Sequence, residues 1–207
     1  MSNESGRKTG PWVPILGLGL IIIAVVVVAS RSGQKQESAP AVSSESAASA
    51  PAAPPKGADF VWYDAPRDAP ATVFKDAADA DKTLADFKGK ALVVNFWATW
   101  CAPCVKEMPT LDALQAQLGG DTFQVLTISQ DREGAKVAQP FVEKNGWKNL
   151  ALYTEPQGRF QRDASIKGLP TTIIIDKSGK EIGRVEGEVK WTSDVVVDKL
   201  KSLAAAP

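Results

Sequence analysis

The sequence contains no histidine and only two cysteines among its 207 residues. Without an imidazole, the chain lacks Ser-His and Cys-His catalysis, histidine metal ligands and the side chain that ordinarily titrates near neutral pH. Two cysteines are also too few to close a four-thiolate zinc site within one chain. The polar chemistry open to the protein is therefore that of thiols, carboxylates, lysines and the backbone.

An excess of charge of either sign is missing as well. The 24 basic side chains balance the 24 acidic ones, and the isoelectric point is about 6.4. Nucleic-acid-binding domains normally carry a basic patch or stripe, so we expect no nucleic-acid partner. The length is that of one or two domains.

A long uncharged segment lies near the N-terminus. No residue of 9–30 carries a charge, and residues 15–28 are almost wholly apolar. A helix of roughly 20 apolar residues crosses the hydrocarbon core of a bilayer. We therefore expect residues 1–30 to form an N-terminal membrane anchor, with one transmembrane helix at residues 12–30. A signal peptide cleaved near Ala29 is the alternative.

Two further regions follow this segment. Residues 31–57 are rich in Ala, Ser and Pro, and Val42 is their one large aliphatic residue. Such a composition cannot bury a core, so it predicts a disordered linker. Residues 58–207 are numerous enough for one well-buried domain. The sequence thus predicts a globular domain tethered to a membrane.

Hydrophobic patterning predicts alternating strands and helices within that domain. Short β-branched or aromatic runs predict strands at 91–97, 123–129, 171–175 and about 180–187. Helical spacing predicts one helix that ends at Gly119-Gly120, a second at about 134–144 that is interrupted or restarted near Pro140, and a last one from about Thr192. This order predicts an α/β sandwich with a mixed central sheet flanked by helices.

Both cysteines belong to one C-x-x-C motif, Cys101-Ala102-Pro103-Cys104, between the first of these strands and the first helix. At a helix start, unpaired N–H groups and the helix dipole lower a thiol pKa from about 8.5 to between roughly 3.5 and 7.5. Cys104 follows one turn later, close enough to form a disulfide with Cys101. The motif predicts a pair that cycles between dithiol and disulfide. Half of an intermolecular zinc site and an inert structural disulfide are the alternatives.

The surroundings of the motif resemble the thioredoxin superfamily, and within it the membrane-anchored TlpA/ResA-like thiol-disulfide oxidoreductases. The resemblance covers nearly all of residues 80–205. It is carried by residues 94–104 (VNFWATWCAPC), by Glu107-Met108-Pro109 and by Gly168-Leu169-Pro170-Thr171-Thr172. It implies a thioredoxin-like sandwich and no cofactor or metal.

The resemblance also assigns roles to single residues. Cys101 corresponds to the attacking cysteine, and Cys104 to the buried resolving cysteine. Pro170 stands at the position of the family's cis-proline, opposite the cysteines, whereas the sequence without the family indicates an ordinary proline before a strand. The residues implied in substrate binding are Trp100, Ala102, Pro103, Leu169 and Pro170.

Glu107 has two interpretations. Classical thioredoxins carry a buried aspartate where this chain has Asn95. In the TlpA/ResA-like proteins a glutamate at the position of Glu107 is thought to serve instead as the proton acceptor for the resolving thiol. The residues alone favour a solvated helix glutamate paired with a lysine such as Lys106. Trp97 and Met108 are expected in the core.

The resemblance implies a single-pass protein of the bacterial inner membrane, with its catalytic domain in the periplasm or on the outer face. It would reduce protein disulfides of apocytochrome c or of copper-site assembly proteins, with a membrane thiol electron-transfer protein as reductant. The cytochrome-c-maturation branch usually shows Gly-x-Pro-Glu-Thr, so Thr171 favours the TlpA-like side. The alternatives are a disulfide-donating oxidant, a copper chaperone, which would need histidine and wider cysteine spacing, and a thiol peroxidase.

Overall fold

The computed structural model describes residue 10 and residues 60–206. The predicted linker at residues 31–57 lies outside the described residues, and so does the predicted anchor at residues 1–30 apart from Gly10. Within the described part of the chain, no helix combines the length and the apolar character that crossing a bilayer requires.

The domain is built on one mixed sheet of eight strands in the order β1-β8-β7-β4-β5-β6-β2-β3. Strands β4, β5 and β6 run parallel to one another, and every other pairing is antiparallel. The strands are β1 Phe60–Asp68, β2 Phe74–Asp76, β3 Asp81–Lys82, β4 Ala91–Trp97, β5 Phe123–Ser129, β6 Ala151–Thr154, β7 Thr171–Ile175 and β8 Lys180–Glu186.

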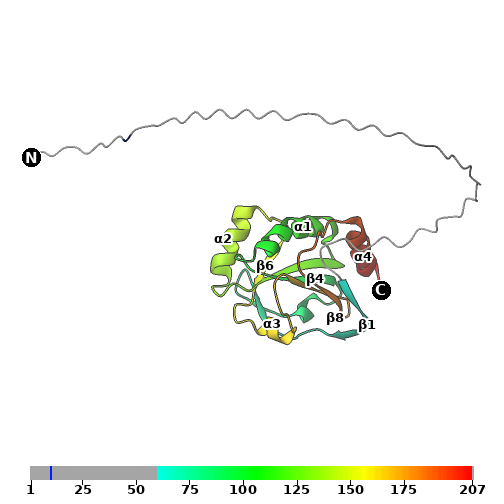
Figure 1. Ribbon diagram of the computed structural model, residues 1–207. Helices are drawn as coiled ribbons and strands as arrows, with labels where there is room; N and C mark the ends of the chain where they lie inside the picture. The colour runs from blue at the N-terminus through cyan, green and yellow to red at the C-terminus, as the bar shows by residue number, and fades with distance from the viewer. Residues whose placement is uncertain (1–9, 11–59, 207) are drawn as a thin grey trace, which may run out of the picture. The chain divides into compact units, whose positions relative to one another are not determined.

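Helices cover both faces of this sheet (Figure 1). They are α1 Ala102–Leu118, α2 Ala135–Asn145, α3 Arg159–Asp163 and α4 Asp194–Ala205, with a 3-10 helix, η1, at Leu84–Phe87. Alternate residues of β4 enter two separate cores. Val93 and Trp97 pack with residues of α1, α2 and α4, whereas Val94 and Phe96 pack with residues of α3 and η1. The period-2 alternation of the central strand thus divides the apolar interior into two layers.

The sheet register brings two distant segments to one end of the sheet. β4 pairs with β7 so that Phe96 lies opposite Thr171, and it pairs in parallel with β5 so that Trp97 lies opposite Ser129. The chain that leaves β4 carries the C-x-x-C motif, and the chain that enters β7 carries Pro170. The C-x-x-C motif and Pro170 therefore lie at the same end of the sheet.

The most apolar elements agree with the sequence predictions. β4, β5 and β7 have the predicted bounds, α1 ends before Gly119, and β8 starts where the Asp176–Gly179 turn predicts. These strands are buried along nearly their whole length, and a continuous apolar run is typical of strands covered on both faces. The last helix begins at Asp194, two residues later than expected, with Ser193 as its N-cap.

The predicted interruption near Pro140 is wrong, because α2 continues through this residue from Ala135 to Asn145. Proline removes one N–H from the helical ladder and normally kinks or ends a helix. Pro140 lies on the exposed face of α2, and Lys136, whose carbonyl loses its helical partner, is an exposed residue as well. Ala138 and Val142 are buried on either side of it and hold the helix against the core.

Several elements were not predicted, namely β1, β2, β3, β6, η1 and α3. β2, β3, β6, η1 and α3 span at most five residues each, which is too short for a period to be recognised. β1 is longer but mostly exposed, and it pairs with β8 at the edge of the sheet. The alternation of apolar and polar residues along β1 is weak, because the strand pairs with β8 alone and contacts little of the core.

Gly183 should be required for the docking of β1 on β8. A Cβ atom at this position would lie 2.8 Å from the Val61 carbonyl oxygen and 2.9 Å from a ring carbon of Trp62. Backbone cannot yield as a flexible side chain does, so we expect Gly183→Ala to lower the free energy of unfolding by about 1–3 kcal/mol. Urea unfolding measures this, with Gly120→Ala as the control, since a Cβ there meets nothing within 4 Å. Equal stabilities of the two variants would contradict this account of the β1–β8 contact.

Candidate active site

The two cysteines occupy the first turn of α1. Cys101 is the N-cap residue with an extended backbone, and Pro103 stands in the first turn, where a missing N–H costs no helical bond. Cys101 and Cys104 form a disulfide with their Cα atoms 5.3 Å apart. The Cys104 backbone N–H donates a hydrogen bond to Cys101 Sγ at 3.4 Å. In the reduced protein the same amide and the helix dipole stabilise negative charge on this sulfur.

The two sulfurs differ in their surroundings. Cys104 is completely buried, and Cys101 is 5% exposed. Around Cys101, Ala102 and Pro103 are exposed, and the Trp100 side chain is 71% exposed. Trp97, by contrast, is fully buried and packs edge-on against Trp147, as expected of a core residue. The exposed rim of the motif therefore consists of Trp100, Ala102 and Pro103.

The loop before Cys101 is held by Asp131, which follows the end of β5. The Asp131 carboxylate accepts hydrogen bonds from the Thr99 backbone N–H at 3.0 Å, the Thr99 hydroxyl at 2.8 Å and the Ser129 hydroxyl at 2.8 Å. These bonds fix the path of the chain that delivers Trp100 and Cys101 to the surface. Sequence reasoning missed this role, because the carboxylate and the loop it holds lie far apart along the chain.

Pro170 is buried at the start of β7, and the Leu169–Pro170 peptide bond is cis. Leu169 is half-buried and Gly168 is exposed. A groove of about 900 Å³ extends along this side of the molecule, and Trp100, Gln161 and Leu169 are among its lining residues. The structure thus places Leu169 and Trp100 along one groove.

Glu107 lies on the buried face of α1, one turn after Cys104. Its side chain is 1% exposed. Oε1 accepts a hydrogen bond from Asn95 Nδ2 at 2.7 Å. Oε2 accepts from the Val189 backbone N–H at 2.9 Å and from Trp191 Nε1 at 3.2 Å. The interpretation of Glu107 as a solvated glutamate paired with Lys106 is therefore wrong, since Lys106 instead forms an ion pair with Glu188.

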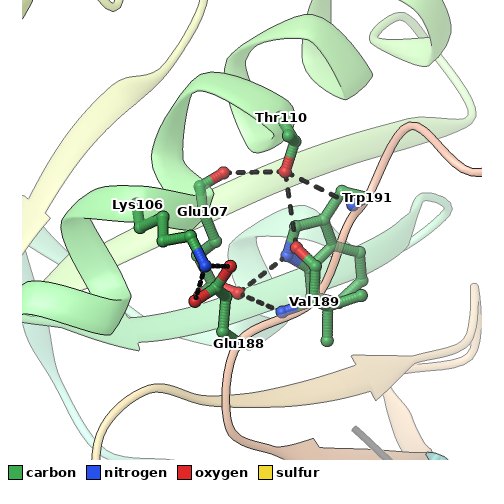
Figure 2. Close-up of polar contacts among 6 residues, drawn as sticks. All are labelled: Lys106, Glu107, Thr110, Glu188, Val189 and Trp191. Atoms are coloured by element: carbon green, nitrogen blue, oxygen red, sulfur yellow. Dashed lines mark hydrogen bonds and ion pairs between the residues drawn. The ribbon is translucent and has the colours of Figure 1, made fainter. Parts of the chain in front are cut away.

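The segment between β8 and α4 covers the Glu107 carboxylate (Figure 2). Besides Val189 and Trp191, this segment carries Glu188, whose carboxylate lies 2.7 Å from Lys106 Nζ. Thr110 adds a further contact, because its hydroxyl accepts a hydrogen bond from the Trp191 backbone N–H at 3.3 Å. Sequence reasoning missed this cover. A backbone amide leaves no mark in a sequence, and the one available signal was Trp191, an aromatic residue between polar ones.

Burial raises the pKa of the Glu107 carboxyl from 4.5 to about 7. The hydrogen bonds from Val189, Asn95 and Trp191 favour the ionised form and lower the pKa, but desolvation outweighs them. The nearby charge of Glu188 raises the pKa slightly further. A carboxyl that titrates near neutrality, one helical turn from a buried thiol, can take up a proton from that thiol.

A central mixed sheet, helices on both faces and a C-x-x-C disulfide at a helix start define a thioredoxin-like thiol-disulfide site. Comparison with known proteins agrees with this class. The Redoxin family matches residues 56–201, and the chain belongs to this family.

Three relatives illustrate the similarity. The thiol-disulfide oxidoreductase ResA of Bacillus thuringiensis is 33% identical over 137 residues, 66% of this chain and 77% of ResA. The thiol:disulfide interchange protein HelX of Rhodobacter capsulatus is 33% identical over 129 residues, 62% of this chain and 69% of HelX. A crystal structure of a DsbF homologue from Corynebacterium diphtheriae has a TM-score of 0.57 and 28% identity, over 70% of this chain and 96% of that structure. The chain is a TlpA/ResA-like protein thiol-disulfide oxidoreductase.

The raised pKa of Glu107 should make stability depend on pH. The folded protein binds this proton more tightly than the unfolded chain does, so the free energy of unfolding falls as the pH rises from 4.5 to about 7 and levels off beyond. A shift of this size corresponds to about 3 kcal/mol. We expect Glu107→Gln to lose this component when the oxidised protein is unfolded in urea at about pH 5 and about pH 8. The exposed Glu143 gives the control, since Glu143→Gln should keep the full difference; an undiminished difference in Glu107→Gln would contradict the assignment.

Proposed function

We propose that this oxidoreductase is a reductase of protein disulfides in the biogenesis of cytochrome c or of the copper site of cytochrome oxidase. The observation that carries the direction of electron flow is the buried carboxyl of Glu107 beside the buried thiol of Cys104. The substrate class is supported by the resemblance of residues 94–104 and of the Pro170 segment to the TlpA/ResA-like proteins.

The buried carboxyl favours a reducing pair. Cys104 and Glu107 lie three residues apart on α1, so their side chains lie on the same face of the helix. A carboxylate in apolar surroundings repels a second negative charge and raises the pKa of a neighbouring thiol. A dithiol is a weaker reductant when its thiolate form is stabilised, as in the strongly oxidising members of this fold. Glu107 acts in the opposite sense on Cys104, because it disfavours the thiolate until it accepts the proton.

The reaction begins with the thiolate of Cys101, which attacks one sulfur of the substrate disulfide and displaces the other as a thiolate. The carboxylate of Glu107 then takes the proton of the Cys104 thiol. The Cys104 thiolate attacks Cys101 Sγ and forms the Cys101–Cys104 disulfide. The bond between Cys101 Sγ and the substrate breaks, and the substrate sulfur that was attacked first leaves as a thiolate. Two electrons pass from the protein to the substrate, and the Glu107 proton returns to solvent afterwards.

Docking uses the exposed rim of the site. The substrate chain lies along the groove between Trp100 and Leu169, where the backbone beside Pro170 offers groups for β-type pairing. Ala102 and Pro103 contact the substrate next to Cys101. The exposed ring of Trp100 supplies apolar contact area that a partner can bury.

The oxidised pair needs an electron source, and we assign this role to a membrane thiol electron-transfer protein. The uncharged apolar segment at residues 12–30 supports a single-pass anchor in the bacterial inner membrane. In this arrangement residues 31–57 link the anchor to the catalytic domain, residues 58–207, in the periplasm or on the outer face. Substrate, reductant and enzyme then meet at the same membrane.

Trapping tests the division of labour between the cysteines. The probe is an oxidised peptide with a Cys-x-x-Cys-His sequence, the haem-attachment pattern of c-type cytochromes. Reduced wild-type protein should convert it to the dithiol, whereas Cys104→Ser should accumulate a mixed disulfide with the peptide at Cys101. Mass spectrometry after acid quenching identifies the species. Cys101→Ser is the matched control and should form none. Comparable capture through Cys104 in that control would overturn the assignment.

The reduction potential of the Cys101–Cys104 pair tests the direction of electron flow. We expect a value below about −200 mV, in the range of reducing members of the fold, because Glu107 opposes the thiolate form. Equilibration of full-length protein in glutathione buffers gives the potential, and Glu107→Gln should raise it. A value near about −120 mV would identify a disulfide donor instead. Failure to observe any reversible two-electron couple would identify a structural disulfide.

A further inference from the structure

The side chain of Asn95 forms the floor beneath Glu107. It projects from β4 towards α1 and is completely buried. Its Nδ2 group donates to Glu107 Oε1 at 2.7 Å and to Thr172 Oγ1 at 2.9 Å, across the β4–β7 pair that places Asn95 opposite Thr172. Its Oδ1 atom is buried and has no hydrogen-bond partner among the described residues. A buried amide oxygen without a partner is unfavourable and calls for an explanation.

The hydrogen bonds of Glu107 suit the ionised carboxylate. Asn95 Nδ2, the Val189 backbone N–H and Trp191 Nε1 are all donors, and a carboxylate is an acceptor alone. The protonated acid has a different need, because its O–H is a donor and requires an acceptor. Oε2 already receives two hydrogen bonds, so the proton belongs on Oε1, where it would point at the N–H of Asn95.

We propose that the side-chain amide of Asn95 turns over when Glu107 is protonated, so that Asn95 Oδ1 accepts the hydrogen bond of the acid. The inference rests on the proposed function of Glu107 as proton acceptor. The hydroxyl of Thr172 accommodates both orientations, since it accepts from Nδ2 in one and donates to Oδ1 in the other. The turn exchanges the two ends of the amide, so either orientation leaves one end in the buried position that has no hydrogen-bond partner among the described residues. Asn95 is therefore a positioning residue that offers a donor to the carboxylate and an acceptor to the acid, whereas an aspartate in its place has no N–H to donate.

The titratable groups that surround Glu107 come from two elements. Cys101, Cys104 and Lys106 lie on or directly before α1, and Glu188 lies on the segment that covers the carboxylate. Beneath Glu107 the sheet contributes Asn95 and, through it, Thr172, neither of which titrates. In the oxidised protein the cysteines form a disulfide and do not titrate. In oxidised protein the protonation of Glu107 and the response of Asn95 can therefore be observed without a simultaneous titration of the cysteines.

Infrared spectroscopy of oxidised full-length protein tests the proposal on the wild type, and Asn95→Leu identifies the acceptor. The carbonyl band of protonated Glu107 is assigned by its loss in Glu107→Gln. Its frequency is lower for an acid whose O–H donates a hydrogen bond than for an acid whose O–H is free. We expect the donating frequency in the wild type, with a shift to the free-acid frequency in Asn95→Leu. A wild-type band at the frequency of an acid with a free O–H would contradict the proposed turn of the amide, whatever the behaviour of the variants.

The pKa of Glu107 gives a second, independent readout from the same titration. Trp191→Phe removes a donor that binds the charged carboxylate more strongly than the neutral acid and that cannot accept the proton of the acid, so it should raise this pKa. Asn95→Leu removes a partner of both forms, so its effect on the pKa should be smaller than that of Trp191→Phe. A rise in Asn95→Leu equal to or larger than that in Trp191→Phe would identify Asn95 as a fixed donor. Neither measurement involves turnover. If Glu107 plays no part in catalysis, Cys104 will resolve the mixed disulfide at the same rate in Glu107→Gln as in the wild type. The infrared band of protonated Glu107 will still test the turn of the Asn95 amide.

Discussion

The burial of one carboxyl group connects the parts of this domain. Glu107 reaches from α1 to Asn95 on the central strand and to Val189 and Trp191 on the segment before α4. A carboxylate removed from water is strongly unfavourable unless donors replace its hydration. Sheet, helix and covering segment must therefore come together as a unit, and the group that holds them is also the group that lies beside the resolving thiol. The contacts of Glu107 therefore affect both the stability of the domain and the reactivity of the neighbouring thiol.

The sheet supplies the geometry on which this arrangement rests. β4 is a central strand. Its register with β5 and β7 brings the Asp131 carboxylate, the Cys101 loop and Pro170 to one end of the sheet. Alternation along β4 then sends Asn95 to the α1 side, whereas Val94 and Phe96 enter the opposite core. A one-residue slip in this register would place Asn95 in the α3 core and leave Glu107 without its floor. The geometry of the site thus depends on the correct pairing of β4, β5 and β7.

The sequence predicted what local patterns determine. β4, β5, β7 and α1 follow from continuous apolar runs and helical spacing, and Cys101 and Cys104 follow from the motif. Long-range contacts were out of reach, and β6 was missed because four residues carry too little pattern. The role of Glu107 could be inferred by resemblance, but its partners could not. Val189 acts through its backbone, and no spacing rule connects Trp191 to a residue 84 positions earlier in the chain.

The exposure of Trp100 has a practical consequence. Trp97, Trp147 and Trp191 are buried in the core, whereas the Trp100 ring is 71% exposed beside the disulfide. The emission of an indole shifts to shorter wavelength when water around it is replaced by apolar groups. A partner that covers Trp100 would therefore change the fluorescence of the protein at the reactive surface, while the buried Trp97, Trp147 and Trp191 keep their emission. Trp62, which is 39% exposed on β1, is the other exposed indole of the described residues. The enzyme carries its own optical label for complex formation.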